Sequence, residues 1–324
     1  MKKIKIGLLG FGNIGTGTYR ILEMNHRKIA ETTGCELEIT RILVNDPSKK
    51  REISVPSGKF TKDPDTILND PEIDIVVEVL GGIEPAASYM LKAMKNGKSV
   101  VTANKAAVAA NFAELKSVAA ANNVLFRFEA SVAGGIPVLN ALSTALSGNE
   151  FEEISGIVNG TTNYILTQMT ENGSAYEDVL KDAQAKGFAE ADPTADVEGI
   201  DAANKLSILM ALAFGKYVAP SDIPTTGISK ITKADIDAAK ERGCKIKLLA
   251  SAKKNGNDVE YSVKPVELPL SHPLAGVSNE FNAVFVTGNA VGELMFYGRG
   301  AGSLPTGSAV MGDIIEIAKA VAAK

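Results

Sequence analysis

The sequence predicts an α/β protein of two domains, the first a doubly wound parallel sheet and the second an α+β domain with a mixed sheet. Over the first 130 residues, short β-branched runs alternate with helical patterns, which is typical of a parallel sheet covered by helices. A glycine-rich turn at residues 10–15 joins the first of these strands to the first helix. Later in the chain, turn residues separate consecutive strands, and such hairpin signals indicate antiparallel pairing.

The first domain is expected at residues 1–130. Its strands are predicted at 3–9, 36–44, 73–80, 99–103 and 124–128, with helices after residue 13, at 85–95 and at 107–122. The run IDIVVEVL at 73–80 is apolar at most positions, as in a strand buried on both faces. Ligands of such sheets bind beyond the carboxyl ends of the strands. One crevice is therefore expected to collect the residues at these ends, namely 10–12, 81–82, 104–105 and Glu129.

The glycine turn has the pattern G-x-G-x-x-G between a strand and a helix, which is the context of a dinucleotide-binding fingerprint. Gly10 permits the tight turn, Gly12 lets the backbone approach a pyrophosphate, and Gly15 allows close packing of helix and strand. The helix N-terminus offers N–H groups and a partial positive charge to the phosphates. The alternative is a turn that only joins strand to helix. The pattern predicts a Rossmann-type domain whose cofactor contacts include Gly10, Phe11, Gly12, Asn13, Ile14 and Gly15.

The second domain is expected at residues 131–302; the family resemblance described below implies that it binds substrate and forms the dimer contact. Its strands are predicted near 152–158, 246–252, 259–266, 281–287 and 293–297, in an antiparallel or mixed sheet. Thr161 or Thr162 is expected to cap a helix that runs through Met169. A last helix, 303–324, is expected to pack back on the first domain.

Composition excludes several classes of protein. With 34 Lys+Arg against 38 Asp+Glu and a net charge of −4, no large basic surface is available for nucleic acid or a membrane surface. No apolar run approaches the ~18 residues that span a bilayer. The two cysteines, Cys35 and Cys244, suggest neither a disulfide framework nor a metal cluster. A cytoplasmic enzyme that starts directly with its nucleotide-binding strand is expected.

Residues 186–205, KGFAEADPTADVEGIDAANK, are rich in carboxylates and end on a lysine. If 197–212 form one helix, Asp201 and Lys205 share a face, because residues four apart are neighbours there. A lysine held among acids can protonate a developing alkoxide while a carboxylate binds an ammonium group. A solvated acidic loop that caps an ordinary helix explains this segment equally well by itself.

Six segments together resemble homoserine dehydrogenase: GFGNIG (10–15), VVEVLGGIEP (76–85), VTANKA (101–106), FEASVAGGIP (128–137), ADPTADVEGIDAANK (191–205) and GRGAGSLPTGSAV (298–310). The resemblance covers almost the whole chain. It implies NAD(P)-dependent interconversion of L-aspartate 4-semialdehyde and L-homoserine, on the route to threonine and methionine, by a homodimer. The chain stops where the C-terminal regulatory domain of many members would begin, so control by threonine through that domain is not expected.

The resemblance also implies roles for single residues. Lys205 would be the general acid in reduction and the base in oxidation, with Lys105 near cofactor and substrate. Glu190 and Asp201 would bind the substrate. Gly187 and Gly302 would lie close to the nicotinamide, although both are equally explained as turn glycines. A structural sodium ion would be held by Glu129, Val132, Gly134 and Ile136.

Several points stay open at this level. Lys205 can also be a surface lysine paired with Asp201, and Asp192 and Asp196 can support the site or only form turns. Asp46 favours NAD, whereas the basic residues at 49–51 accommodate NADP, so both coenzymes are expected.

Two other functions compete with this interpretation. An aldehyde-oxidising dehydrogenase would need a nucleophile such as Cys244 with a base, but His26 and His272 have no motif around them. A dinucleotide-sensing regulator would need a partner-binding or basic element, which the sequence does not display.

Overall fold

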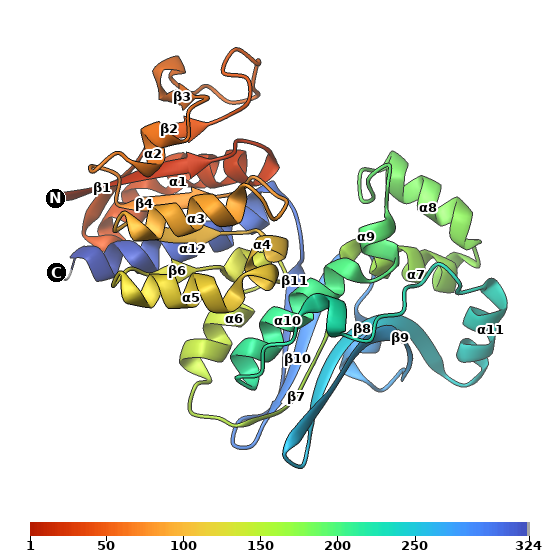
Figure 1. The fold of residues 1–324 in the computed structure, drawn as a ribbon. Coiled ribbons are helices and arrows are strands. Elements are labelled where there is room, and N and C mark those ends of the chain that lie inside the picture. Colours follow the sequence, from red (N-terminus) through yellow and green to blue (C-terminus); the bar gives the residue numbers. More distant parts are fainter. Residues whose placement is uncertain (323–324) are drawn as a thin grey trace. The chain divides into compact units, whose positions relative to one another are not determined.

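The computed structural model describes residues 1–322, which divide into two compact units. Of these residues, the first unit comprises 1–135 and 301–322, and the second comprises Ile136–Gly300. Each unit has its own sheet (Figure 1). Among residues 1–322, the helices are too short or too polar for any of them to cross a lipid bilayer.

The sheet of the first unit is parallel throughout, in the order β3-β2-β1-β4-β5-β6. Its strands are β1 (Lys2–Leu9), β2 (Cys35–Leu43), β3 (Phe60–Thr61), β4 (Ile75–Glu78), β5 (Ser99–Thr102) and β6 (Phe126–Arg127). The strand order reverses between β1 and β4, and ligands of doubly wound sheets bind at such a switch point. The predicted doubly wound sheet is confirmed. The two-residue β3 was not predicted, because so short an edge strand leaves no periodic pattern.

The helices of the first unit are α1 (Asn13–Thr33), α2 (Asp65–Leu68), α3 (Ala86–Lys95), α4 (Lys105–Ala110), α5 (Phe112–Ala121) and α12 (Ser303–Ala322). Helices α1 and α12 lie side by side, and glycines permit the approach. A Cβ on Gly17 would lie 2.0 Å from the Ser303 carbonyl oxygen, and one on Gly307 would lie 2.7 Å from the Gly17 backbone. The single helix expected at 107–122 is wrong, because Asn111 leaves helical geometry (φ −125°, ψ 23°) and separates α4 from α5.

The second unit has the sheet β11-β10-β7-β8-β9. Its strands are β7 (Phe151–Ile157), β8 (Cys244–Asn255), β9 (Asp258–Pro269), β10 (Phe281–Gly288) and β11 (Gly292–Arg299). Every pair of neighbours is antiparallel, so the sheet is not mixed, although the α/β class is as expected. The turns β8–β9 and β10–β11 are tight, with Gly256 and Gly292 at positive φ, and such hairpins impose antiparallel pairing.

The helices of the second unit are α6 (Val138–Asn140), α7 (Gly160–Asn172), α8 (Tyr176–Ala185), α9 (Thr194–Val197), α10 (Ile200–Ala213) and α11 (Lys233–Glu241). Two predicted helix starts were wrong. Asn159, not Thr161 or Thr162, caps α7, because its side-chain oxygen accepts from the Thr162 N–H. The helix expected from residue 197 begins at Ile200, because Gly199 (φ +82°) separates it from α9.

Candidate active site

The glycine turn follows β1 and opens α1, and each of its glycines meets a different steric demand. Gly10 has φ +103°, and a Cβ there would lie 2.7 Å from the Val79 carbonyl oxygen. A Cβ on Gly15 would lie 2.5 Å from the Gly10 carbonyl oxygen, so Gly15 allows the turn to close on the helix. Gly12 is the N-cap of α1, and a Cβ there would meet nothing within 4 Å. The backbone at Gly12 therefore faces open space.

That open space is a cavity of about 470 Å³ in the first unit. Its lining comes from the ends of β1, β2 and β4 and the loops after them: Gly10, Phe11, Gly12, Leu43, Val44, Asn45, Asp46, Lys49, Arg51, Val79 and Leu80. The N-terminus of a long helix, a backbone without side chain and two cationic residues meet here. This combination suits the pyrophosphate and ribose of a dinucleotide, so the residues present fit such a cofactor.

Contacts within the loop after β2 order the basic residue Arg51 of this cavity. The Arg51 guanidinium lies 4.1 Å from the Phe60 ring centroid and donates to the carbonyl oxygens of Asp46 (2.8 Å) and Lys49 (2.7 Å). The pKa of Asp46 is lowered, chiefly by the hydrogen bond from the Ser48 hydroxyl (2.6 Å). An ionised carboxylate and an ordered guanidinium therefore stand at the same end of the cavity.

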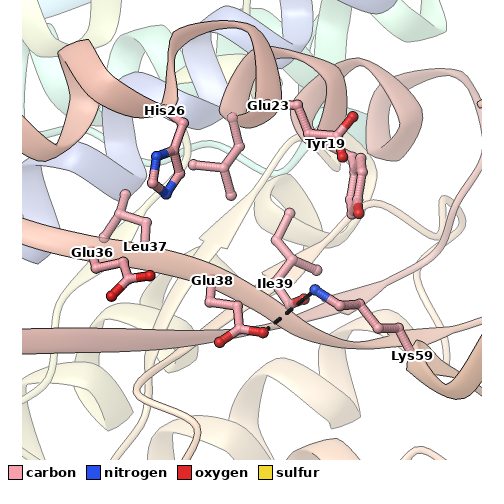
Figure 2. A pocket seen from close by; sticks show the side chains of 9 residues that line it. Tyr19, Glu23, His26, Glu36, Leu37, Glu38, Ile39 and Lys59 are labelled. Atoms are coloured by element: carbon pink, nitrogen blue, oxygen red, sulfur yellow. Dashed lines mark hydrogen bonds and ion pairs between the residues drawn. The ribbon is translucent and has the colours of Figure 1, made fainter. Parts of the chain in front are cut away.

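A smaller hollow of about 170 Å³ lies between α1 and β2, in a different place (Figure 2). His26 and Glu23 of α1 line it together with Glu36 and Glu38 of β2, and Lys59 approaches Glu38 at 3.5 Å. These β2 residues belong to the amino-terminal half of the strand. Because ligands of such sheets bind at the carboxyl ends, this hollow is separate from the dinucleotide crevice.

Lys205 and Asp201 form a buried ion pair in the second unit. Nζ of Lys205 donates to Oδ2 of Asp201 at 2.6 Å and to the Val158 carbonyl oxygen at 2.7 Å. The two residues are only 8% and 5% exposed, so the interpretation as a surface pair is wrong. Asp201 lies in the first turn of α10, where a carboxylate is favoured by the helix dipole.

Asn159 completes this arrangement and was missed as a site residue. Its amide donates to Oδ2 of Asp201 at 2.9 Å and to Oδ1 of Asp196 at 2.7 Å, so both of its N–H groups are bound to carboxylates. Thr161 also donates to Asp196, at 3.2 Å. An asparagine directly before a helix is the signal that could have found it, since asparagine is a preferred N-cap.

The remaining predicted substrate and cofactor residues lie on exposed segments or helix starts. Glu190 and Gly187 are exposed in the coil after α8, with Gly187 at φ +75°. Gly302 (φ +120°) precedes α12 in the first unit. Lys105 is the first residue of α4 and is partly buried. Asp192 acts as a turn former, because its carboxylate accepts from the Thr194 N–H and hydroxyl.

The predicted cation loop starts with a buried carboxylate. Glu129 is 6% exposed, and its N–H donates to Oδ2 of Asp313 at 2.9 Å. Burial raises the pKa of Asp313 to about 8. Ala133 and Gly134 both have φ of 56°, which turns the chain sharply within the loop. Ile136 is the first residue of the second unit.

The chemistry of the predicted cation ligands is that of a hard-cation site. The expected ligands are all oxygens, namely the carboxylate of Glu129 and the carbonyl groups of Val132, Gly134 and Ile136, and oxygen is the ligand type that alkali and alkaline-earth ions prefer. No group of three or more His, Cys, Asp or Glu side chains with metal-binding geometry occurs within residues 1–322.

His272 and the two cysteines have structural surroundings. His272 caps a short helical turn by accepting from the Leu274 N–H, and its ring packs on Phe285. Cys35 is buried, and the Cys244 thiol donates to the Arg242 carbonyl oxygen at 3.6 Å. These contacts give no support to a cysteine nucleophile with a histidine base.

Comparisons with known proteins identify the family of this chain. The family model "Homoserine dehydrogenase, NAD binding domain" matches residues 10–129, and the model "Homoserine dehydrogenase" matches residues 137–315. The homoserine dehydrogenase of Bacillus subtilis (strain 168) is 47% identical over 319 residues, which are 98% of this chain and 74% of that protein.

Two solved structures extend the comparison. The crystal structure of a homoserine dehydrogenase from Thiobacillus denitrificans has a TM-score of 0.97 and 45% identity, covering 100% of this chain and 75% of that one. A hyperthermophilic archaeal homoserine dehydrogenase in complex with NADPH has a TM-score of 0.80 and 29% identity, covering 97% of each chain. The chain thus belongs to the homoserine dehydrogenase family of NAD(P)-dependent oxidoreductases, as its motifs predicted.

Proposed function

We propose that this chain interconverts L-aspartate 4-semialdehyde and L-homoserine in threonine and methionine biosynthesis, with Lys205 as the proton donor and acceptor. Family membership supports the reaction. The observation that carries the role of Lys205 is its buried amine, held 2.6 Å from the Asp201 carboxylate. An amine in that setting has a fixed direction, which general acid–base catalysis requires.

The chemistry explains why a lysine is needed. When an aldehyde is reduced, its carbonyl oxygen gains negative charge, and a proton donor at that oxygen stabilises the transition state. The bound nicotinamide supplies or accepts the hydride. Lys205 donates the proton during reduction and removes it from the hydroxyl during oxidation. The bonds from Lys205 to Asp201 and to the Val158 carbonyl oxygen orient its amine.

The other site residues bind and position. The substrate carries an ammonium group, for which Asp201 and Glu190 are the carboxylate partners. Lys105 lies near cofactor and substrate, at the start of α4. Gly187 and Gly302, both at positive φ, permit close approach of their backbone to the nicotinamide end of the cofactor.

The cofactor is either NAD or NADP. The archaeal relative is in complex with NADPH, and Lys49 and Arg51 of this chain line the cavity where a 2′-phosphate would need a cation. Asp46 lines the same cavity and suits the free ribose of NAD. Both coenzymes are therefore expected to support turnover.

Three further properties complete the proposal. The protein is a cytoplasmic homodimer joined through the second unit, where edge strand β11 exposes Met295 (43%) and Tyr297 (53%). A structural sodium ion binds Glu129, Val132, Gly134 and Ile136. Light scattering during gel filtration tests the dimer, and a melting temperature that is equal in sodium and choline chloride would contradict the ion.

The central experiment is a spectrophotometric assay of the purified chain at 340 nm. Absorbance should rise only when L-homoserine and NAD or NADP are both present, and L-serine in place of homoserine should give little signal. A folded protein that binds the dinucleotide but shows no homoserine-dependent reduction would refute the proposed reaction.

A further inference from the structure

Glu78 is a fully buried carboxylate that the proposed reaction does not use. It is the last residue of β4 and is 0% exposed. It therefore lies at the carboxyl end of a central strand, beside the switch point of the sheet. The pKa of Glu78 is raised, because burial raises it by more than the surrounding hydrogen bonds lower it. Burial of a carboxyl group costs free energy, so its position at the ligand-binding edge of the sheet needs a physical explanation.

All the hydrogen-bond partners of this carboxylate are donors. The Thr102 hydroxyl at the end of β5 donates to Oε2 at 2.6 Å, and the Leu80 N–H donates to Oε1 at 2.7 Å. The Asn104 amide approaches Oε1 at a longer distance, 3.4 Å. Donors from β5 and from both following loops thus converge on one group. This arrangement suits the ionised carboxylate, which accepts only.

Asn104 transmits this arrangement to the neighbouring helix. Its N–H donates to the Thr102 hydroxyl oxygen (3.0 Å), and its amide donates to the Gly82 carbonyl oxygen (2.6 Å). Its side-chain oxygen accepts from the Ala107 N–H at 3.1 Å and so caps α4. The first residue of α4 is Lys105. One hydrogen bond therefore joins the Glu78 carboxylate to Asn104, and one peptide bond joins Asn104 to Lys105.

We propose that Glu78 is a positioning residue, which fixes Lys105 against the 80–82 loop through Thr102 and Asn104. The inference rests on the proposed role of Lys105 beside cofactor and substrate. The ladder between β4 and β5 ends at Glu78 and Thr102, where the Ala103 N–H donates to the Glu78 carbonyl oxygen at 3.3 Å. The carboxylate ties the two loop starts together just beyond the end of that ladder.

Replacing Glu78 by Gln tests this role. The glutamine side chain has the same size, but its NH₂ group is a donor and would face groups that also donate. We expect kcat to fall roughly 10- to 100-fold, the range that small displacements of catalytic groups cause. Thr102→Val removes the same connection and should give a similar fall, whereas Thr102→Ser keeps the hydroxyl and should restore kcat to within about threefold. The matched control is Asp74→Asn, which removes a carboxylate before the other end of β4 that accepts from the Lys5 N–H. It should leave kcat unchanged.

A double-mutant cycle shows whether Glu78 acts through Lys105. In a Lys105→Ala background, Glu78→Gln should change kcat by less than about twofold, because the group that it positions is gone. A loss of kcat as large as in the wild-type background would overturn the proposal. So would a folded Glu78→Gln enzyme with wild-type kcat.

A second readout does not depend on activity. The rate at which acetic anhydride modifies the Lys105 amine, followed by peptide mass spectrometry, should change at least threefold in Glu78→Gln and Thr102→Val, but not in Asp74→Asn. An unchanged rate in the first two variants refutes the positioning role. If Lys105→Ala retains wild-type kcat, the proposed function of Lys105 fails, while a changed modification rate still supports the positioning by Glu78.

Discussion

Asp201 and Lys205 face each other on consecutive turns of α10, with 2.6 Å between Oδ2 and Nζ and little solvent around either side chain. Buried pairs of this kind contribute modestly as a unit, but removal of one partner costs about 3–5 kcal/mol because the other charge stays buried. Asn159 also donates to Asp201 at 2.9 Å, so that carboxylate keeps one partner when Lys205 is replaced. The site can therefore be tested without loss of the fold.

The first prediction concerns Lys205. Lys205→Met should lower kcat for homoserine oxidation by at least about 100-fold, because general acid–base catalysis contributes 10²- to 10⁴-fold. The affinity for NADPH, measured by fluorescence titration, should change less than about threefold, since the glycine turn lies in the other unit. Lys216→Ala, which removes an exposed lysine paired with Asp258, is the control and should keep wild-type kcat. Full activity of Lys205→Met would exclude this residue as the proton donor.

The second prediction separates two glycines of the turn. Gly12→Val should fold normally, because Gly12 has ordinary extended geometry (φ −83°) and open space around a Cβ. Its dinucleotide affinity should fall at least about 100-fold, because valine fills the room of the pyrophosphate. Gly15→Val should instead destabilise the protein, because its Cβ meets the Gly10 carbonyl oxygen at 2.5 Å. Thermal unfolding and calorimetric titration distinguish the two. Wild-type affinity in Gly12→Val would place the cofactor elsewhere.

The third prediction concerns coenzyme choice. We expect kcat/KM for NADPH and NADH to differ by less than about a thousandfold, or roughly 4 kcal/mol. Arg51→Ala should lower kcat/KM for NADPH at least about tenfold and affect NADH less, because only NADPH carries the 2′-phosphate. The control is Arg27→Ala, which removes an exposed arginine of α1 paired with Glu31. Equal losses with both coenzymes in Arg51→Ala would contradict a phosphate contact.

The fourth prediction concerns the pH dependence of stability. Lys247 is 2% exposed, and its Nζ donates to Oδ1 of Asn163 and to the Val277 carbonyl oxygen. Burial lowers its pKa to about 8, from an ordinary value of 10.5. Between these values the unfolded chain binds more protons, so the free energy of unfolding gains up to about 3 kcal/mol as pH rises from 8 to 10.5.

Urea unfolding at pH 7.5, 9 and 10 measures the contribution of Lys247, as the difference in free energy of unfolding between wild type and Lys247→Met. The difference should grow with pH in favour of the wild type. Lys264→Met, a change at an exposed lysine of the adjacent strand β9, should give a difference that does not vary with pH. A constant difference for Lys247→Met would mean that Lys247 does not titrate in this range.

The parallel sheet was predictable because each central strand is a short, continuous apolar run. Residues 75–78 and 99–102 pair in register, and both lie within predicted strands. Such runs are typical of parallel strands that are buried on both faces, so the pattern alone predicts a parallel sheet. The break at Asn111 and the late start of α10 were not predictable in the same way, because single non-helical residues leave the surrounding helical pattern intact.

Only part of the candidate site could be predicted from the sequence, for a similar reason. Lys205 and Asp201 are four residues apart, and helical geometry alone brings them together. Asn159 is 42 residues before Asp201, and Thr102 is 24 residues after Glu78. No spacing rule connects residues so far apart, since their contact depends on how strands and helices pack.

By itself the sequence determined the repeating local features of this protein: the apolar strands, the glycine turn before α1 and the Asp201–Lys205 pair. These follow from periodicity and backbone sterics, which act over a few residues. Only the tertiary structure decided which polar groups are buried and what satisfies them, as with the Asn159 bridge and the Glu78 carboxylate. Burial is a property of packed layers, and the energy of a buried charge depends on donors that distant segments supply.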